Sequence, residues 1–170
     1  SLIQRKGLDL LLPALAKTPE DIRLVIVGEG KEKKALEEQI EKLGLSGRVL
    51  FKGFVEGEKL RTLYKESDAF IIPTREDCFG LVILEAMCAS LPVISSKYAD
   101  GAFDLIVEGK NGYIVDPENT EGFAACITKL FEEDDLKTMG AESYRKAHEF
   151  SFSHVAEGCM DAVEYALKQG

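Results

Sequence analysis

The sequence has few of the residues that build metal sites and disulfide frameworks. Its 170 residues include two histidines and four cysteines, and no two cysteines stand in a Cys-x-x-Cys spacing. Structural zinc sites need closely spaced Cys and His ligands. No metal site is therefore predicted, and we expect buried free thiols in a reducing cytoplasm. The cysteines are Cys78, Cys88, Cys126 and Cys159.

An excess of positive charge and a long apolar run are also lacking. The chain has 21 Lys and Arg against 30 Asp and Glu, a net charge of -9, so long-range attraction to nucleic acid or anionic lipid is absent. No stretch approaches the roughly 20 apolar residues of a membrane span, and residues 1–6 lack the apolar core of a signal peptide. We therefore expect a cytoplasmic chain that contacts neither nucleic acid nor membrane. An anionic ligand remains possible, because a helix amino terminus and a few cations act at short range.

The pattern that is present predicts one α/β domain over residues 1–170. The chain is 45% hydrophobic, enough for one sizeable core. Short apolar runs alternate with longer amphipathic segments, which is typical of a Rossmann-like, doubly wound parallel sheet with helices on both faces. The expected strands are Arg23–Val27, Val49–Lys52, Ala69–Ile72, Pro92–Ser95 and Tyr113–Val115. The expected helices are Gly7–Ala16, Lys31–Leu43, Glu58–Glu66, Gly80–Ser90, Thr120–Glu132, Asp135–Glu149 and Ser153–Leu167.

Residues 71–87, IIPTREDCFGLVILEAM, are the most informative stretch. An apolar strand and an acidic turn precede the helix Gly80–Ser90, which carries one charge, Glu85, and is expected to be buried on nearly every side. In open α/β sheets the first amides of such a helix, here residues 78–81, point to a ligand beyond the strand ends. Glu85 lies one turn below Leu81, where a carboxylate suits ribose hydroxyls. From this segment alone, a Glu85 that is only paired inside the fold is an equal alternative.

Other short motifs follow one another along the whole chain. KGLDLL begins at Lys6, an IVGEG segment follows the first expected strand, and later segments read FKGFV, LYKESDAFIIP, DCFGLVILEAM, LPVIS and NGYIVDP. In order and spacing this set resembles the C-terminal domain of the group 1 (family 4) retaining glycosyltransferases of the GT-B fold. The resemblance implies the nucleotide-sugar-binding half of a two-domain enzyme, without its acceptor-binding half.

The resemblance assigns roles to the residues around the acidic turn. Lys6 falls on the family's diphosphate-binding lysine, which would neutralise charge on the departing diphosphate. Glu85 falls on the glutamate similar to a ribose ligand. Asp77 takes the place of a glutamate beside the donor sugar and is shorter by one methylene. Phe79 and Gly80 match the family, with Leu81 following, whereas a cysteine replaces the usual glycine at position 78.

Two glycine-containing loops complete the implied donor site. Gly28 and Gly30 do not belong to a GxGxxG fingerprint, because Lys33 occupies the third glycine position. We interpret them as a tight turn near the ligand, and a plain structural turn is nearly as good an explanation. Residues 53–55, Gly53, Phe54 and Val55, resemble the family loop whose backbone meets the nucleotide base. The family's partner arginine would fall on position 1 or before it, and residues 100–106 occupy the place of a sugar-facing turn.

The resemblance implies transfer of a sugar from a nucleotide-diphosphate sugar to a glycan or lipid acceptor, with retention and with no metal or other cofactor. The chain alone should bind nucleotide weakly and transfer nothing, since the acceptor site needs an N-terminal domain. The final helix, Ser153–Leu167, is expected to pack toward that N-terminal domain. Whether the full-length protein contacts a membrane through its N-terminal domain stays open. Two alternatives remain. One is part of a nucleotide-sugar 2-epimerase, and the other is a non-catalytic interaction module of the same fold.

Overall fold

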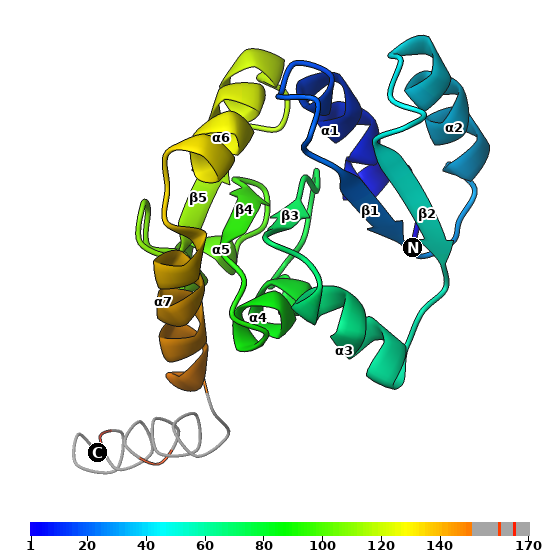
Figure 1. Cartoon of the computed structure of the whole chain (residues 1–170). Coiled ribbons are helices and arrows are strands. Elements are labelled where there is room, and N and C mark those ends of the chain that lie inside the picture. Colours follow the sequence, from blue (N-terminus) through cyan, green and yellow to red (C-terminus); the bar gives the residue numbers. More distant parts are fainter. Residues whose placement is uncertain (151–159, 161–164, 166–170) are drawn as a thin grey trace.

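The computed structural model describes residues 1–150 together with residues 160 and 165, and strands and helices alternate along it (Figure 1). Expected elements up to Asp135–Glu149 are found within two residues of their expected bounds, whereas Ser153–Leu167 lies outside the described residues. The strands are β1 (Leu24–Val27), β2 (Val49–Gly53), β3 (Phe70–Ile72), β4 (Val93–Ser96) and β5 (Gly112–Val115). The helices are η1 (Gln4–Lys6), α1 (Leu8–Leu15), α2 (Lys33–Lys42), α3 (Gly57–Lys65), α4 (Leu81–Cys88), α5 (Ala102–Leu105), α6 (Thr120–Glu132) and α7 (Leu136–His148).

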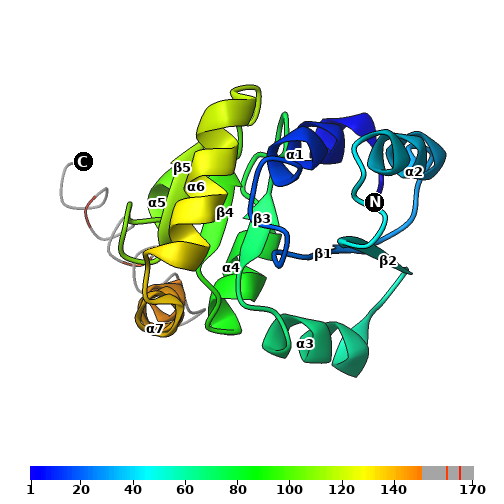
Figure 2. The same cartoon turned by 45° about the horizontal axis from the view of Figure 1, so that its top comes forward.

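The strands pair in parallel, as predicted, but the described residues form two sheets rather than one. β1 pairs with β2, and β3, β4 and β5 form a second sheet in that order. No strand of the described residues joins β1 to β3, and both views show these two strands apart (Figures 1 and 2). The α/β class with parallel strands and helices on both faces is confirmed, and the described strands divide between two sheets. The break falls between two strands that each have only one neighbour.

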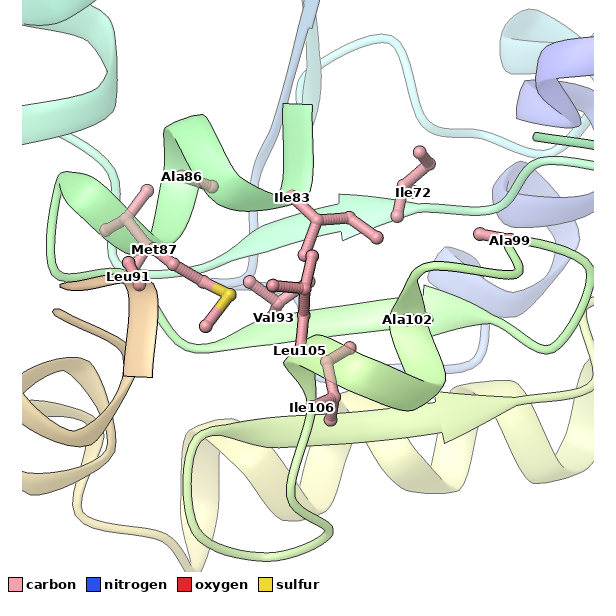
Figure 3. Close-up of a cluster of buried hydrophobic side chains, with 11 residues drawn as sticks. Ile72, Ile83, Ala86, Met87, Leu91, Val93, Ala99, Ala102, Leu105 and Ile106 are labelled. Carbon is pink, nitrogen blue, oxygen red and sulfur yellow. The ribbon is translucent and has the colours of Figure 1, made fainter. Parts of the chain in front are cut away.

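Helices cover both faces of the larger sheet. Ile94 of β4 packs with residues of α1 and α6, whereas Val93 packs with α4 and α5 on the opposite face. Figure 3 shows this second cluster, in which Ile83 and Met87 of α4 lie beside Val93 and Leu105. A parallel strand that is covered on both faces typically has a mostly apolar sequence, because neither face contacts water. This cluster fixes α4 rigidly against the strands from which the site is built.

Helix α4 is buried on one side only. Ile83, Ala86 and Met87 are buried, whereas Leu81 is 65% exposed and Glu85 is also exposed. The expectation of a helix buried on nearly every side is therefore wrong. Positions 81, 85 and 88 recur at helical spacing and form one exposed stripe, which Tyr64 of α3 contacts at Glu85.

The cysteines also differ from expectation. Cys78 and Cys88 are exposed, so the prediction of buried thiols is wrong for these two, which lie in the loop before α4 and on its exposed stripe. Cys126 is half-buried, and burial raises the pKa of its thiol to about 12. Cys159 lies outside the described residues. Residues 100–106, expected to form a turn, contain the one-turn helix α5.

Candidate functional site

Three of the predicted site residues meet just before α4. The Lys6 ammonium Nζ lies 2.7 Å from Oδ2 of Asp77, and Oδ1 of the same carboxylate accepts a hydrogen bond of 2.8 Å from the Gly80 amide. The side chains of Lys6 and Asp77 are 27% and 17% exposed. This is a largely buried ion pair at the start of a helix, assembled from residues more than 70 positions apart.

The surroundings of Asp77 favour its charged form. Burial is the largest influence and opposes ionisation, but the Lys6 ammonium, the Gly80 N–H and the Arg5 guanidinium together outweigh it and lower the pKa of Asp77. Asp77 is therefore a carboxylate at neutral pH. It can orient hydroxyl groups or hold a cation, and it cannot serve as a general acid there.

A close backbone approach places Lys6 beside Asp77. Gly7 follows η1 with a left-handed φ of +67°, and any Cβ at this position would overlap the carbonyl oxygen of Pro73. The Arg75 amide donates to the Arg5 carbonyl at 2.8 Å. The segment that carries Lys6 is thus fastened to the loop that follows β3, and only glycine allows the contact.

The first turn of α4 is open to an anion. Gly80 precedes the helix with φ +70° and has no side chain with which to cap it. The first amides of a helix need an acceptor from outside the helix, and a phosphate oxygen is a suitable one. Phe79 is 39% exposed and Leu81 is 65% exposed on either side of Gly80, which is itself buried, so an apolar rim at the start of the helix faces solvent.

Glu85 lies on the exposed stripe of α4, about 6 Å along the helix axis from Leu81. The hydroxyl of Tyr64, from α3, donates to its Oε2 at 3.2 Å. Burial, followed by the negative charge of Glu85, raises the pKa of Tyr64 well above its usual range. Glu85 and Lys6 line the same cavity of about 740 Å³. The carboxylate is therefore not sealed beneath side chains, and a ligand in that cavity can reach it.

The predicted glycine loops lie at the carboxyl ends of β1 and β2. The Gly28 amide donates to the Gly53 carbonyl at 2.7 Å, and a Cβ on Gly30 would overlap the backbone of Leu2. Phe54 is 71% exposed and Val55 lines the cavity. These residues are not in contact with the Lys6–Asp77 pair. The amino-terminal segment runs between the two groups, since the Leu2 amide donates to the Glu29 carbonyl at 2.8 Å.

Sequence reasoning missed three residues that support the site. Tyr64 holds Glu85 from a neighbouring helix, and its place in the LY motif was the available signal. Thr74 is fully buried, with its hydroxyl 2.9 Å from the Arg5 carbonyl. Arg75 forms two hydrogen bonds of 2.8 and 2.7 Å with the Asp9 carboxylate, and this pairing lowers the pKa of Asp9. A threonine and an arginine directly after a buried strand are a pattern that could have revealed them.

The described part of the chain contains neither a metal-binding cluster nor a membrane-spanning helix. Across residues 1–150, 160 and 165, no three His, Cys, Asp or Glu side chains gather closely enough to hold a metal ion. No helix there combines the length and the apolar character needed to cross a membrane.

The chain is similar to known glycosyltransferases along nearly its whole length. It is 32% identical over 98% of its residues to an uncharacterized glycosyltransferase of Methanocaldococcus jannaschii, of which it covers 44%. Among solved structures, the Anabaena protein HepE in complex with UDP superposes with a TM-score of 0.85 at 28% identity, over 96% of this chain and 46% of HepE. The pneumococcal O-GlcNAc transferase GtfA, in complex with UDP and GlcNAc, gives 0.82 at 27% identity, over 98% of this chain and 34% of GtfA.

The present chain thus spans less than half the length of each of these proteins. The family model described as glycosyl transferases group 1 matches residues 1–147. The predicted resemblance and the GT-B type of fold are confirmed. The chain therefore belongs to the group 1 family of glycosyl transferases.

Proposed function

We propose that this chain is the donor-binding half of a retaining glycosyltransferase, which transfers a hexose from a nucleotide-diphosphate sugar to a glycan or lipid acceptor. One observation carries the proposal: Lys6, Val82 in the first turn of α4, and Glu85 line one cavity. A cation and helix amides suit a diphosphate, and a carboxylate one turn away suits the hydroxyls of a ribose.

The proposed work of the site is electrostatic. The bond between the anomeric carbon and the diphosphate oxygen breaks, and its electron pair leaves with the diphosphate. Lys6 and the amides after Gly80 stabilise this developing charge in the proposed scheme, and no metal takes part. The acceptor oxygen bonds to the same face of the sugar and passes its proton to an oxygen of the departing diphosphate. Asp77, fixed as a carboxylate by Lys6, orients the sugar hydroxyls.

The solved relatives support a uridine nucleotide as the first ligand to test. HepE is in complex with UDP, and GtfA with UDP and GlcNAc. The acceptor site belongs, in this proposal, to a second domain, so the chain alone binds nucleotide weakly and transfers nothing. Packing of residues 153–167 toward that domain, and a cytoplasmic location, stay predictions.

Calorimetric titration of the chain with UDP, GDP and ADP tests the donor site. A hydrogen bond to a charged group contributes about 1.5–3 kcal/mol, so Glu85→Ala should weaken binding of the preferred nucleotide roughly 10- to 100-fold. Glu41→Ala removes an exposed carboxylate from α2, away from the cavity, and should bind as the unmodified chain does. Equal affinities of the unmodified chain and Glu85→Ala would remove Glu85 from the site.

A second candidate is a non-catalytic interaction module. It is favoured by the Lys6–Asp77 ion pair itself, because each group satisfies the other without a ligand. An intact parent that neither hydrolyses nor transfers sugar from a panel of nucleotide-sugar donors would establish this alternative. No observation favours the epimerase, and the match to the glycosyl transferase family weighs against it.

A further inference from the structure

Asp77 already engages two of the anion-binding groups of the candidate site. Its Oδ2 lies 2.7 Å from the Lys6 ammonium, and its Oδ1 accepts a hydrogen bond of 2.8 Å from the Gly80 amide. The two side chains of the ion pair are only 27% and 17% exposed, so water screens their charges less than those of a surface pair. A phosphate that approaches Lys6 therefore meets a cation whose charge a carboxylate already balances.

The Asp77 carboxylate and a phosphate bound to Lys6 must lie close together. An ammonium holds each oxygen partner at about 2.7–2.9 Å, so two oxygens that share the Lys6 Nζ are separated by at most about 6 Å. Like charges at this distance repel in a partly buried site. Burial opposes ionisation of Asp77, but Lys6, the Gly80 N–H and Arg5 keep its pKa below the ordinary value. The repulsion is therefore present at neutral pH.

The donor and the released nucleotide differ by about one charge at this position. In a nucleotide-diphosphate sugar the terminal phosphate is esterified and carries a single negative charge. In the free nucleoside diphosphate it carries nearly two at pH 7, because the second pKa of a phosphate monoester is about 6. The sugar also brings hydroxyl groups that can donate to a carboxylate. A carboxylate beside the terminal phosphate thus favours the donor on both counts.

We infer that Asp77 is a specificity-determining residue, which selects the nucleotide-diphosphate sugar over the free nucleoside diphosphate. The inference rests on the proposed function, since it takes Lys6 as the cation that meets the diphosphate. After transfer the terminal phosphate loses its proton to water at neutral pH and gains a charge beside Asp77. The same carboxylate that orients the sugar therefore favours release of the spent nucleotide.

The space on which Asp77 opens suits a sugar better than a second anion. Asp77 lines a further cavity, of about 270 Å³, between the loop before α4 and the loop after β4. Both cations of this lining are paired with carboxylates, Arg75 with Asp9 and Lys97 with Asp116. The charged and titratable groups around Asp77 are Lys6 and Arg5 from η1, Arg75, Glu76 and Cys78 from its own loop, and Lys97, Tyr98 and Asp100 from the loop after β4.

Calorimetric titration with a nucleoside diphosphate and with its glucose ester tests the inference. The ligands are whichever of UDP, GDP and ADP binds best and the matching UDP-glucose, GDP-glucose or ADP-glucose. Asp77→Asn removes the charge and leaves an oxygen for the Gly80 amide. The free nucleotide should bind to this variant roughly fivefold more tightly than to the unmodified chain, whereas the ester should gain nothing.

Two further variants serve as controls. Asp116→Asn makes the same change in the exposed Lys97–Asp116 pair, whose charged atoms are also 2.7 Å apart, and should leave both affinities unchanged. Asp77→Glu keeps the charge and should keep the preference for the ester. An equal ratio of the two affinities in the unmodified chain and in Asp77→Asn would overturn the inference and leave the donor site standing.

The pH dependence separates charge repulsion from a structural role of Asp77. Between pH 7.5 and pH 5 the terminal phosphate of the free nucleotide takes up a proton, while Asp77 stays ionised. None of the groups around Asp77 is a histidine, the side chain that ordinarily changes charge in this range. The preference of the unmodified chain for the ester should therefore shrink at pH 5, and that of Asp77→Asn should not.

This comparison needs only the unmodified chain, so it decides the matter even if Asp77→Asn does not fold. A preference of the unmodified chain that is the same at pH 7.5 and pH 5 would overturn the inference. An unmodified chain that binds neither ligand at millimolar concentrations would instead contradict the proposed donor site, and the inference with it.

Discussion

β1 and β4 are both four-residue strands in parallel pairing, yet their burial differs. All four residues of β4, Val93 to Ser96, are buried, whereas only Ile26 is buried in β1. β4 has a strand on each side and packed helices on each face, while β1 has a single partner, β2, and lines the cavity of about 740 Å³. The burial of a strand is therefore set by the strands and helices that pack around it. An apolar sequence makes burial possible but does not ensure it.

The candidate site contains residues from both the well-packed part and the open part of the molecule. Asp77, Gly80 and Glu85 lie on the side of the well-packed β3–β5 sheet, and Gly28 and Gly53 lie on the open side. The ion pair and capping bonds that fix Asp77 come from elements with a shared core. We expect the diphosphate end of the ligand to meet a rigid surface and the base end to meet a more adaptable one.

The largest effect should come from Ile94→Ala. Ile94 is fully buried between α1 and α6, and loss of such a side chain costs about 2–5 kcal/mol because a cavity remains. Ile71 is its register partner on β3, where it lines the cavity and is only half-buried. Ile71→Ala should cost less than half as much in denaturant unfolding. Equal losses of unfolding free energy for the two variants would show that the two positions are equally packed and would contradict the difference between the centre and the edge of the sheet.

Asp77→Asn should have an intermediate effect that depends on pH. The change removes the charge that pairs with Lys6 but leaves an oxygen for the Gly80 amide, so we expect a loss of roughly 1–2 kcal/mol at pH 7. The folded pKa of Asp77 lies below its ordinary value of 3.8. The stabilisation is therefore complete above that value and disappears as pH falls through the folded pKa. The stability difference between the unmodified chain and Asp77→Asn should shrink below pH 3.8.

An exposed ion pair provides the control for that titration. Lys97 and Asp116 are 2.7 Å apart, but their side chains are 41% and 37% exposed. Water and salt screen such a pair, so Asp116→Asn should change stability far less than Asp77→Asn. A stability difference for Asp77→Asn that stays constant from pH 6 to pH 3 would contradict the role of the ion pair.

The smallest effect concerns the contact between α3 and α4. Tyr64→Phe removes the hydrogen bond to Glu85, which is worth about 0.5–1.5 kcal/mol. We expect nucleotide affinity to fall roughly two- to tenfold by calorimetry, without the larger loss expected for Glu85→Ala. Tyr144→Phe, on the exposed face of α7, is the matched control and should leave affinity unchanged. Unchanged affinity for Tyr64→Phe would mean that Glu85 needs no support from α3.

Periodicity and turn residues predicted the five strands and the helices between α1 and α7 except α5, because apolar spacing and glycine positions are local properties of the chain. The family resemblance assigned Lys6, Asp77 and Gly80 to one donor site, and the structure brings these three residues together. The break between β1 and β3 could not be predicted, since the sequence of an apolar strand does not show whether the strand pairs on one side or on both. The exposed stripe of α4 was not predicted for a similar reason. Leu81 is apolar, so its sequence pattern indicates burial, and yet it is exposed.

The central claim is that the opening of α4 binds the nucleotide diphosphate of the donor. Amide chemical-shift mapping of the chain during a UDP titration measures this most directly. The account predicts that the largest changes fall on Gly80, Leu81 and Val82, with smaller ones at Gly53 and Phe54. Changes confined to β5 and α6, or no change at UDP concentrations in the millimolar range, would contradict it.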